Sequence, residues 1–180
     1  MAKILIRPLV KKDVEDAAKI RINGWKTAYK GIINDNHLNS LNVEEQIKKF
    51  EKYVGKDNFI VAVEDEKVLG FCRFSYDNSS SSNIDYVDCE LNALYVHPEF
   101  KGNGIGTKLF KYVLNVLCNL NKKSMILWCL ADNVNSINFY KHMGGKIKES
   151  KIATIGEENY KEVGIVFDIK ELCSNSSIKV

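Results

Sequence analysis

LYVHPEFKGNGIGT, the stretch from Leu94 to Thr107, decides how this chain folds. A strand-like run ends at a proline, and three glycines at alternate positions then open an amphipathic helix. Gly102, Gly104 and Gly106 allow a tight turn without side chains, so the first N–H groups of the helix point at one place. The positive end of the helix dipole favours an anion there by about 0.3–1 kcal/mol. The stretch therefore predicts a phosphate- or pyrophosphate-binding loop.

The glycine spacing argues against two familiar phosphate loops. A Walker A loop needs a second glycine five residues after Gly102, where this chain has Thr107. The dinucleotide fingerprint reads G-x-G-x-x-G, whereas the glycines here read G-x-G-x-G and no acidic residue closes the next strand. A simpler alternative is a glycine-rich turn at an ordinary strand–helix junction.

The stretch resembles motif A of the GNAT superfamily of acetyl-CoA-dependent N-acetyltransferases, which reads Q/R-x-x-G-x-G/A after a strand written L-Y-V-x-P. Lys101 stands where the family has Gln or Arg, so a donor is kept but the planar fork of arginine is lost. The resemblance implies that the main chain of three strand residues pairs with the pantetheine arm of acetyl-CoA: Leu94, Tyr95 and Val96. It further implies that six backbone N–H groups bind the pyrophosphate: Lys101, Gly102, Asn103, Gly104, Gly106 and Thr107.

A second stretch, NVNSINFYKHMGG from Asn133 to Gly145, resembles the family's motif B, N-x-x-[AS]-x-x-F-Y-x-x-x-G-F. Asn133, Ser136 and Tyr140 lie three and four residues apart and share one helix face. The resemblance implies that Tyr140 protonates the leaving thiolate and that Asn133 and Ser136 contact the cofactor, Asn133 by binding the pantetheine arm or ordering the helix. The alternative for Tyr140 is a core aromatic with a satisfied hydroxyl. Gly145 replaces the usual aromatic, which predicts looser packing at the start of the next strand.

The acceptor amine needs a base, because an alkylamine titrates near 10.4 and is mostly protonated at pH 7. Glu90, at the start of the cofactor strand, is the first candidate, and Asp88, with the same side-chain parity, is the second. The alternative for Glu90 is a solvated edge residue.

The acceptor pocket is expected near the first helices and the last hairpin. Trp25 and Tyr29 form an i,i+4 aromatic pair that suits a pocket wall or, equally, helix packing. Tyr160, on the last hairpin, is expected to close this pocket. Asp88 is expected near its mouth, where an acidic residue suits a cationic amine or, alternatively, forms part of a solvated rim.

The composition excludes several classes of protein. A net charge of +3 with only three arginines argues against nucleic-acid binding, and no apolar run approaches the roughly 20 residues of a membrane span. Five widely spaced cysteines read as free thiols of a cytoplasmic protein, and no Cys/His cluster predicts a metal site. Abundant Lys, Asn and Ile indicate an AT-rich bacterial genome.

Residues 1–180 are expected to form one α/β (α+β) domain with the GNAT fold. The periodicities predict strands at 4–7, 59–64, 67–76, 89–96, 125–130, 146–155 and 160–169, and helices at 13–30, 43–54, 104–120 and 134–142. The resulting order β-α-α-β-β-β-α-β-α-β-β is the GNAT order, with a mixed, mostly antiparallel sheet of about seven strands flanked by about four helices.

The predicted function is transfer of the acetyl group of acetyl-CoA to a primary amine, which is a small amine, an amino-acid derivative or a protein or peptide amine. The alternatives are a non-catalytic acyl-CoA-binding module and an enzyme that uses a longer acyl-CoA. The expected partners are the acyl donor and the amine, without nucleic acid or membrane. Homodimers are common in the family, but no feature of the sequence establishes one.

Overall fold

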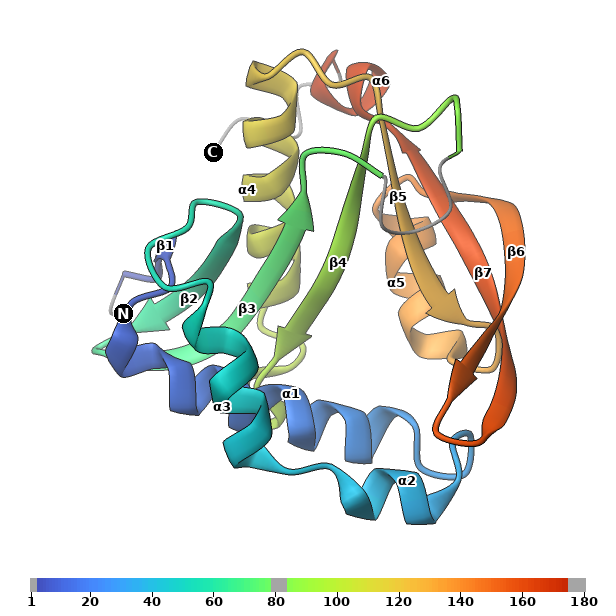
Figure 1. Cartoon of the computed structure of the whole chain (residues 1–180). Coiled ribbons are helices and arrows are strands. Elements are labelled where there is room, and N and C mark those ends of the chain that lie inside the picture. Colours follow the sequence, from blue (N-terminus) through green and yellow to red (C-terminus); the bar gives the residue numbers. More distant parts are fainter. Residues whose placement is uncertain (1–2, 79–83, 175–180) are drawn as a thin grey trace. The chain divides into compact units, whose positions relative to one another are not determined.

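The computed structural model describes residues 3–78 and 84–174 (Figure 1). Its strands are β1 (Leu5–Pro8), β2 (Phe59–Glu64), β3 (Lys67–Ser75), β4 (Cys89–Val96), β5 (Ser124–Leu130), β6 (Lys146–Ile155) and β7 (Glu158–Asp168). Its α-helices are α1 (Val14–Ala28), α2 (Asp35–Ser40), α3 (Val43–Glu51), α4 (Ile105–Asn119), α5 (Val134–His142) and α6 (Ile169–Ser174). Two short 3-10 helices, η1 (Lys11–Asp13) and η2 (Pro98–Phe100), precede α1 and the glycine loop.

The predicted order of strands and long helices is confirmed, and two short helices are added to it. Asn34 begins α2 by accepting a hydrogen bond from the backbone N–H of Asn36. Asp168 begins α6 in the same way, with an acceptor oxygen 2.9 Å from the Glu171 nitrogen. Side-chain caps of this kind stabilise a first helical turn without an apolar repeat.

The strands are hydrogen-bonded in the order β1-β2-β3-β4-β5-β7-β6. The pairs β1–β2, β2–β3, β5–β7 and β6–β7 are antiparallel, and β4–β5 is parallel, so the predicted mixed, mostly antiparallel sheet is confirmed. The β4–β5 ladder places Cys89 opposite Met125 and Glu90 opposite Ile126 and includes no further pair among the described residues.

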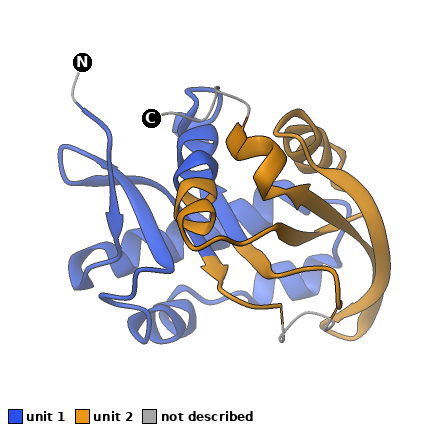
Figure 2. Cartoon of the chain, turned by 90° about the horizontal axis from the view of Figure 1, so that it is seen from above, with its two compact units in different colours: residues 1–73, 93–112 blue, residues 74–92, 113–180 orange. Residues whose placement is uncertain are grey.

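The chain divides into two compact units, shown in blue and orange in Figure 2. Unit 1 comprises residues 1–73 and 93–112, and unit 2 comprises residues 74–92 and 113–180. The strand β4 and the helix α4 contribute residues to both. The expectation of one domain over residues 1–180 remains a prediction.

The core of unit 1 forms where α1 and α3 pack on one face of the strands. Phe50 of α3 contacts Phe59 and Phe71 edge to face, with ring centroids 4.8 and 5.3 Å away. The same cluster contains buried residues of α1 and, on β4, the partly buried Ala93 and Tyr95. Aromatic pairs of this kind add about 0.5–1.5 kcal/mol beyond the area that they bury. The core therefore fixes the end of β4 against α1.

The core of unit 2 is built on β5 and β7, which pair over the whole of β5. Val87, Ile126 and Val166 form a buried cluster, against which Ile84 and Trp128 pack. Next to this ladder, β6 pairs with β7 through a bulge between Ile147 and Glu149. These contacts hold the start of β4, which carries Glu90, beside β5.

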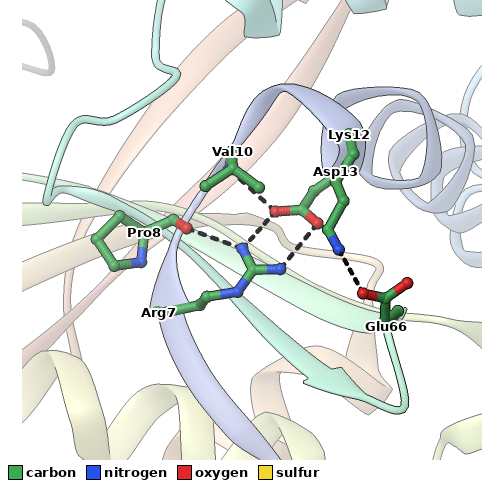
Figure 3. Close-up of polar contacts among 6 residues, drawn as sticks. All are labelled: Arg7, Pro8, Val10, Lys12, Asp13 and Glu66. Atoms are coloured by element: carbon green, nitrogen blue, oxygen red, sulfur yellow. Dashed lines mark hydrogen bonds and ion pairs between the residues drawn. The ribbon is translucent and has the colours of Figure 1, made fainter.

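A buried ion pair joins β1 to the start of α1 in unit 1 (Figure 3). The Asp13 carboxylate is 1% exposed and accepts hydrogen bonds from both Arg7 nitrogens, at 2.5 and 3.0 Å, and from the Val10 backbone N–H at 3.0 Å. The hydrogen bonds to Asp13 raise the pKa of Arg7. Nearby, Lys12 contacts Glu66 on the surface at 2.8 Å, a pair of little energetic weight.

We expect Arg7→Leu to lower the free energy of unfolding by about 2 kcal/mol. Removal of one partner of a buried ion pair costs about 3–5 kcal/mol, because the other charge is left without compensation, and we discount this value because Arg7 itself is partly exposed. Urea unfolding measures the loss. Lys12→Leu is the matched control and should change stability by less than about 0.5 kcal/mol; equal losses in both variants would refute the role given to Asp13.

Candidate functional site

The glycine loop has the backbone conformation that the sequence predicts. Gly102 and Gly104 have φ of +82° and +74°, in the region where a residue with a Cβ is strained. A Cβ built on either glycine would meet no atom within 4 Å, so the space beside both glycines is open. Gly104 begins α4, since its carbonyl accepts the hydrogen bond of Lys108 at 3.0 Å. The loop thus ends in the N-terminus of a helix of 15 residues.

Five consecutive or nearly consecutive N–H groups of this loop are available. Among the residues that the structure describes, no acceptor is bonded to the N–H groups of Gly102, Gly104, Ile105, Gly106 and Thr107. The N–H groups of Lys101 and Asn103 instead bond within the turn, to Pro98 O at 3.3 Å and Phe100 O at 3.4 Å. Four of the six N–H groups expected to bind an anion are therefore unbonded, together with that of Ile105, and an anion site at this helix N-terminus stays a prediction.

Tyr95, on the strand that leads to this loop, is held on three sides. Its hydroxyl accepts a hydrogen bond from Trp25 Nε1 at 2.8 Å. A Cβ on Gly24 of α1 would lie 2.8 Å from the Tyr95 ring, and a Cβ on Gly70 of β3 would lie 2.7 Å from the Tyr95 carbonyl oxygen. Both glycines are therefore needed for the close approach of α1 and β3 to Tyr95. Sequence reasoning missed this role, because only the fold brings the three residues together.

We expect Gly70→Ala to cost about 1–3 kcal/mol of stability, the usual range for overpacking, and to weaken coenzyme A binding. The added methyl would push against the backbone of Tyr95, which has less freedom to move than a side chain. Urea unfolding and a coenzyme A titration measure the two effects. Gly31→Ala is the control, since it places a Cβ in open space at φ of +76° and strains only its own turn. Unchanged coenzyme A affinity in Gly70→Ala would contradict the expectation.

The predicted aromatic pair forms at the C-terminal end of α1, where Tyr29 directly follows the helix. The rings of Trp25 and Tyr29 meet edge to face with centroids 5.0 Å apart, and His37 of α2 lies 6.2 Å from the Trp25 ring. Trp25 and Tyr29 are both half-buried. Trp25 thus packs inside unit 1 and also keeps part of its ring accessible.

In unit 2, Glu90 is buried rather than a solvated edge residue. It is 9% exposed, and its Oε2 is buried without a hydrogen-bond partner among the described residues. A buried carboxylate oxygen without a partner is costly and marks a functional candidate. Asp88 is engaged instead, since its Oδ2 accepts a hydrogen bond from the Lys123 backbone N–H at 2.5 Å. Of the two candidate bases, Glu90 has a buried oxygen without a partner among the described residues, whereas Asp88 has one oxygen bonded to the backbone.

Helix α5 carries the motif B residues. Asn133 is 7% exposed and caps α5 by accepting a hydrogen bond from the Ser136 backbone N–H at 3.2 Å, so Asn133 orders the helix. Tyr140 is half-buried, with its ring centroid 5.1 Å from Phe139 and 6.5 Å from Phe167. On the last hairpin, the Tyr160 hydroxyl donates to Glu158 Oε2 at 2.7 Å.

The expected loosening of the strand after α5 is wrong. A Cβ on Gly145 would lie 2.5 Å from Ile165 Cγ2 and 2.7 Å from Phe167 Cζ. Side chains of β7 thus fill the space that the family's aromatic would need, so only a residue without a side chain fits at position 145.

The structure gathers the predicted residues in two groups, one within each unit. Unit 1 holds the glycine loop, the end of β4, Trp25 and Tyr29. Unit 2 holds Glu90, Asp88, Tyr160 and the motif B helix. Across residues 3–78 and 84–174, no three His, Cys, Asp or Glu side chains are grouped to hold a metal ion. No helix in the same part of the chain is long and apolar enough to cross a membrane.

The seven-stranded mixed sheet and the glycine loop at the N-terminus of α4 are the features expected of the family that the sequence resembles. The model of the acetyltransferase (GNAT) family matches residues 27–144, and the chain belongs to this family. It is a GNAT N-acetyltransferase.

Two curated relatives and one solved structure illustrate the likeness. The chain is 28% identical over 162 residues to the uncharacterized N-acetyltransferase YuaI of Bacillus subtilis, covering 90% of this chain and 91% of that protein. It is 32% identical over 77 residues to the thialysine N-epsilon-acetyltransferase of Mus musculus, covering 43% of this chain and 42% of that protein. The PaiA N-acetyltransferase of Thermoplasma acidophilum, solved in complex with coenzyme A, has a TM-score of 0.67 and 21% identity over 92% of this chain and 99% of that one, which shows the fold.

Proposed function

We propose that this protein transfers the acetyl group of acetyl-CoA directly to the primary amine of a small molecule or peptide. The observation that carries the proposal is the set of unbonded N–H groups at Gly102, Gly104, Ile105, Gly106 and Thr107. Backbone donors at a helix N-terminus fit a pyrophosphate, because each phosphate oxygen accepts several hydrogen bonds and the helix dipole adds to the attraction.

In the proposed reaction, the amine nitrogen attacks the thioester carbon, the C–N bond forms and the C–S bond breaks. Backbone groups of Leu94, Tyr95 and Val96 hold the pantetheine arm, and the Tyr95 N–H meets the developing oxyanion. The contacts of Tyr95 with Trp25, Gly24 and Gly70 support this assignment, since an oxyanion donor must be fixed in advance.

Two side chains of unit 2 are proposed to move the protons. Glu90 accepts the proton of the amine through water, supported by its buried oxygen without a partner. The Tyr140 hydroxyl donates a proton to the departing thiolate of coenzyme A. Asn133 and Ser136 order the helix that carries Tyr140.

Trp25, Tyr29 and Tyr160 are proposed to border the acceptor amine, with Asp88 as the weaker candidate because its carboxylate is bonded to the backbone. The name of the thialysine N-epsilon-acetyltransferase points to the side-chain amine of an amino acid as one acceptor class.

Burial raises the pKa of the Cys89 and Cys129 thiols to about 12, so both stay protonated, which fits a cytoplasmic protein with free thiols.

The test is acetyl-CoA turnover, followed by thiol release, against polyamines, aminoglycosides, amino acids and short peptides. Coenzyme A binding is followed in parallel by thermal shift. Turnover with one class supports the proposal and names the acceptor class. Binding without turnover on any amine favours the non-catalytic module, and turnover only with longer acyl-CoA favours the acyltransferase alternative. Absence of coenzyme A binding would overturn the role of the loop.

A further inference from the structure

Arg21 of α1 is a partly exposed cation whose charge has no acidic partner in the described residues. Its Nη1 donates to Gln46 Oε1 at 2.9 Å, and its guanidinium carbon lies 4.8 Å from the centroid of the Trp25 ring. Gln46, on α3, is 5% exposed and neutral. A guanidinium has five N–H donors, so four remain without an acceptor among the described residues.

Arg7, by contrast, has an acidic partner. There the buried Asp13 carboxylate accepts two hydrogen bonds and neutralises the charge. At Arg21, a buried amide and an aromatic face orient the guanidinium but leave its charge uncompensated. An oriented, uncompensated guanidinium matches a carboxylate, which accepts two parallel hydrogen bonds from its fork.

Arg21 is connected to the residues of the proposed reaction through Trp25 and Tyr95. Trp25, over which Arg21 lies, donates to the Tyr95 hydroxyl. Tyr95 is the residue proposed to meet the thioester oxygen, and α1 also packs against η2, directly before the glycine loop. All of these residues belong to unit 1, so one compact unit carries both the anchor and the proposed oxyanion donor.

We propose that Arg21 binds a carboxylate of the acceptor and makes this enzyme selective for amines that carry one, such as amino acids or peptides with a free C-terminus. The inference rests on the proposed function, because it names the class of acceptor for that reaction. Arg21 is a specificity residue in this proposal and moves no proton.

The first test compares amines that differ only by a carboxylate: 2,4-diaminobutyrate with 1,3-diaminopropane, ornithine with putrescine, and lysine with cadaverine. A short peptide and its C-terminal amide form a fourth pair, which separates a peptide source from a free amino acid. In at least one pair, kcat/KM should be about tenfold or more higher for the carboxylated member. Arg21→Gln should bring this ratio near one and leave kcat/KM for the diamine or amide within about twofold.

A binding measurement keeps the test independent of turnover. Trp25 and Trp128 are the two tryptophans of the chain, so Trp128→Phe leaves Trp25 as the only tryptophan, which excitation at 295 nm selects over tyrosine. In that background, the carboxylated member of a pair should change the Trp25 fluorescence at a concentration about tenfold or more below its partner, and Arg21→Gln should abolish the difference. Arg21→Lys keeps the charge but not the planar guanidinium, so it should retain part of the difference between the two members of a pair.

Arg73→Gln is the matched control. Arg73 also lies over an aromatic ring, 5.2 Å from the Tyr53 centroid, and bonds to a neutral group, the Tyr53 hydroxyl. Its loss removes the same charge and should leave the carboxylate preference unchanged. If Arg21 only joined α1 to α3, Arg21→Gln would lower the melting temperature without changing the preference, and this result would overturn the proposal.

The two proposals fail separately. Transfer to amines with no carboxylate preference in any pair would overturn the inference on Arg21 and leave the acetyltransferase proposal intact. Carboxylate-dependent fluorescence that requires Arg21, with no thiol release on any amine, would support the anchor and count against the proposed reaction.

Discussion

Replacement of Tyr140 by phenylalanine is expected to lower kcat about 100-fold and to leave the Kd for coenzyme A unchanged. The variant removes only the hydroxyl that is proposed to protonate the leaving thiolate, and general-acid catalysis contributes about 100-fold or more. The ring keeps its contacts with Phe139 and Phe167, at 5.1 and 6.5 Å, so the fold of α5 should be preserved. Steady-state thiol release and a coenzyme A titration measure the two quantities.

Tyr86→Phe is the matched control for this experiment. Tyr86 lies in the same unit, and its exposed hydroxyl bonds to Glu149, so the same atom is removed outside the proposed chemistry. Its kcat should stay within about twofold of the parent. If Tyr140→Phe also retained full turnover, the thiolate would be protonated by another group and the role carried over from motif B would be wrong.

The parts of the site that the sequence predicts are those encoded by neighbouring residues. The alternation of glycines before an amphipathic run determines both the positive φ of Gly102 and Gly104 and the start of α4. The turn at Asp65 and Glu66, both with positive φ, likewise lies between two strands that are adjacent in the sequence, β2 and β3. Local backbone geometry depends on local sequence, and these features follow from it.

Contacts between residues far apart in sequence could not be predicted in this way. The hydrogen bond from Trp25 to Tyr95 joins residues 70 positions apart, and the roles of Gly24 and Gly70 depend on which strand and helix Tyr95 meets. The N–H groups of the glycine loop are a second case, in which residues only a few positions apart determine which donors are free. Lys101 and Asn103 were expected to bind phosphate, but the 3-10 turn η2 supplies carbonyl acceptors for both N–H groups.

Glu90 and Asp88 illustrate why two similar residues can have different roles. The sequence places both carboxylates at the start of one strand with the same parity. Lys123, directly before β5, supplies a backbone N–H for Asp88, whereas Oε2 of Glu90 has no partner among the described residues. Only the pairing of β4 with β5, which sets Glu90 opposite Ile126, creates that difference.

Gly145→Phe, which restores the aromatic of motif B, is expected to lower the free energy of unfolding by about 3 kcal/mol or more. The Cβ alone would lie 2.5 Å from Ile165 Cγ2, and overpacking a filled core costs about 1–3 kcal/mol even for smaller additions. Urea unfolding measures the loss, and Gly145→Ala should give an intermediate value.

Compensating substitutions on β7 test the cause of that loss. Ile165 and Phe167 occupy the space that an aromatic at position 145 would need, so Ile165→Ala or Phe167→Ala should be less destabilising in the Gly145→Phe protein than in the parent. Because the Phe167 ring also lies 6.5 Å from that of Tyr140, Gly145→Phe should lower turnover as well as stability. A Gly145→Phe protein as stable as the parent would mean that β7 leaves room for the family's aromatic, as the sequence alone suggests. If truncation of Ile165 or Phe167 restores stability to the Gly145→Phe protein, side chains of β7 occupy in this chain the space that the aromatic of motif B occupies in the family.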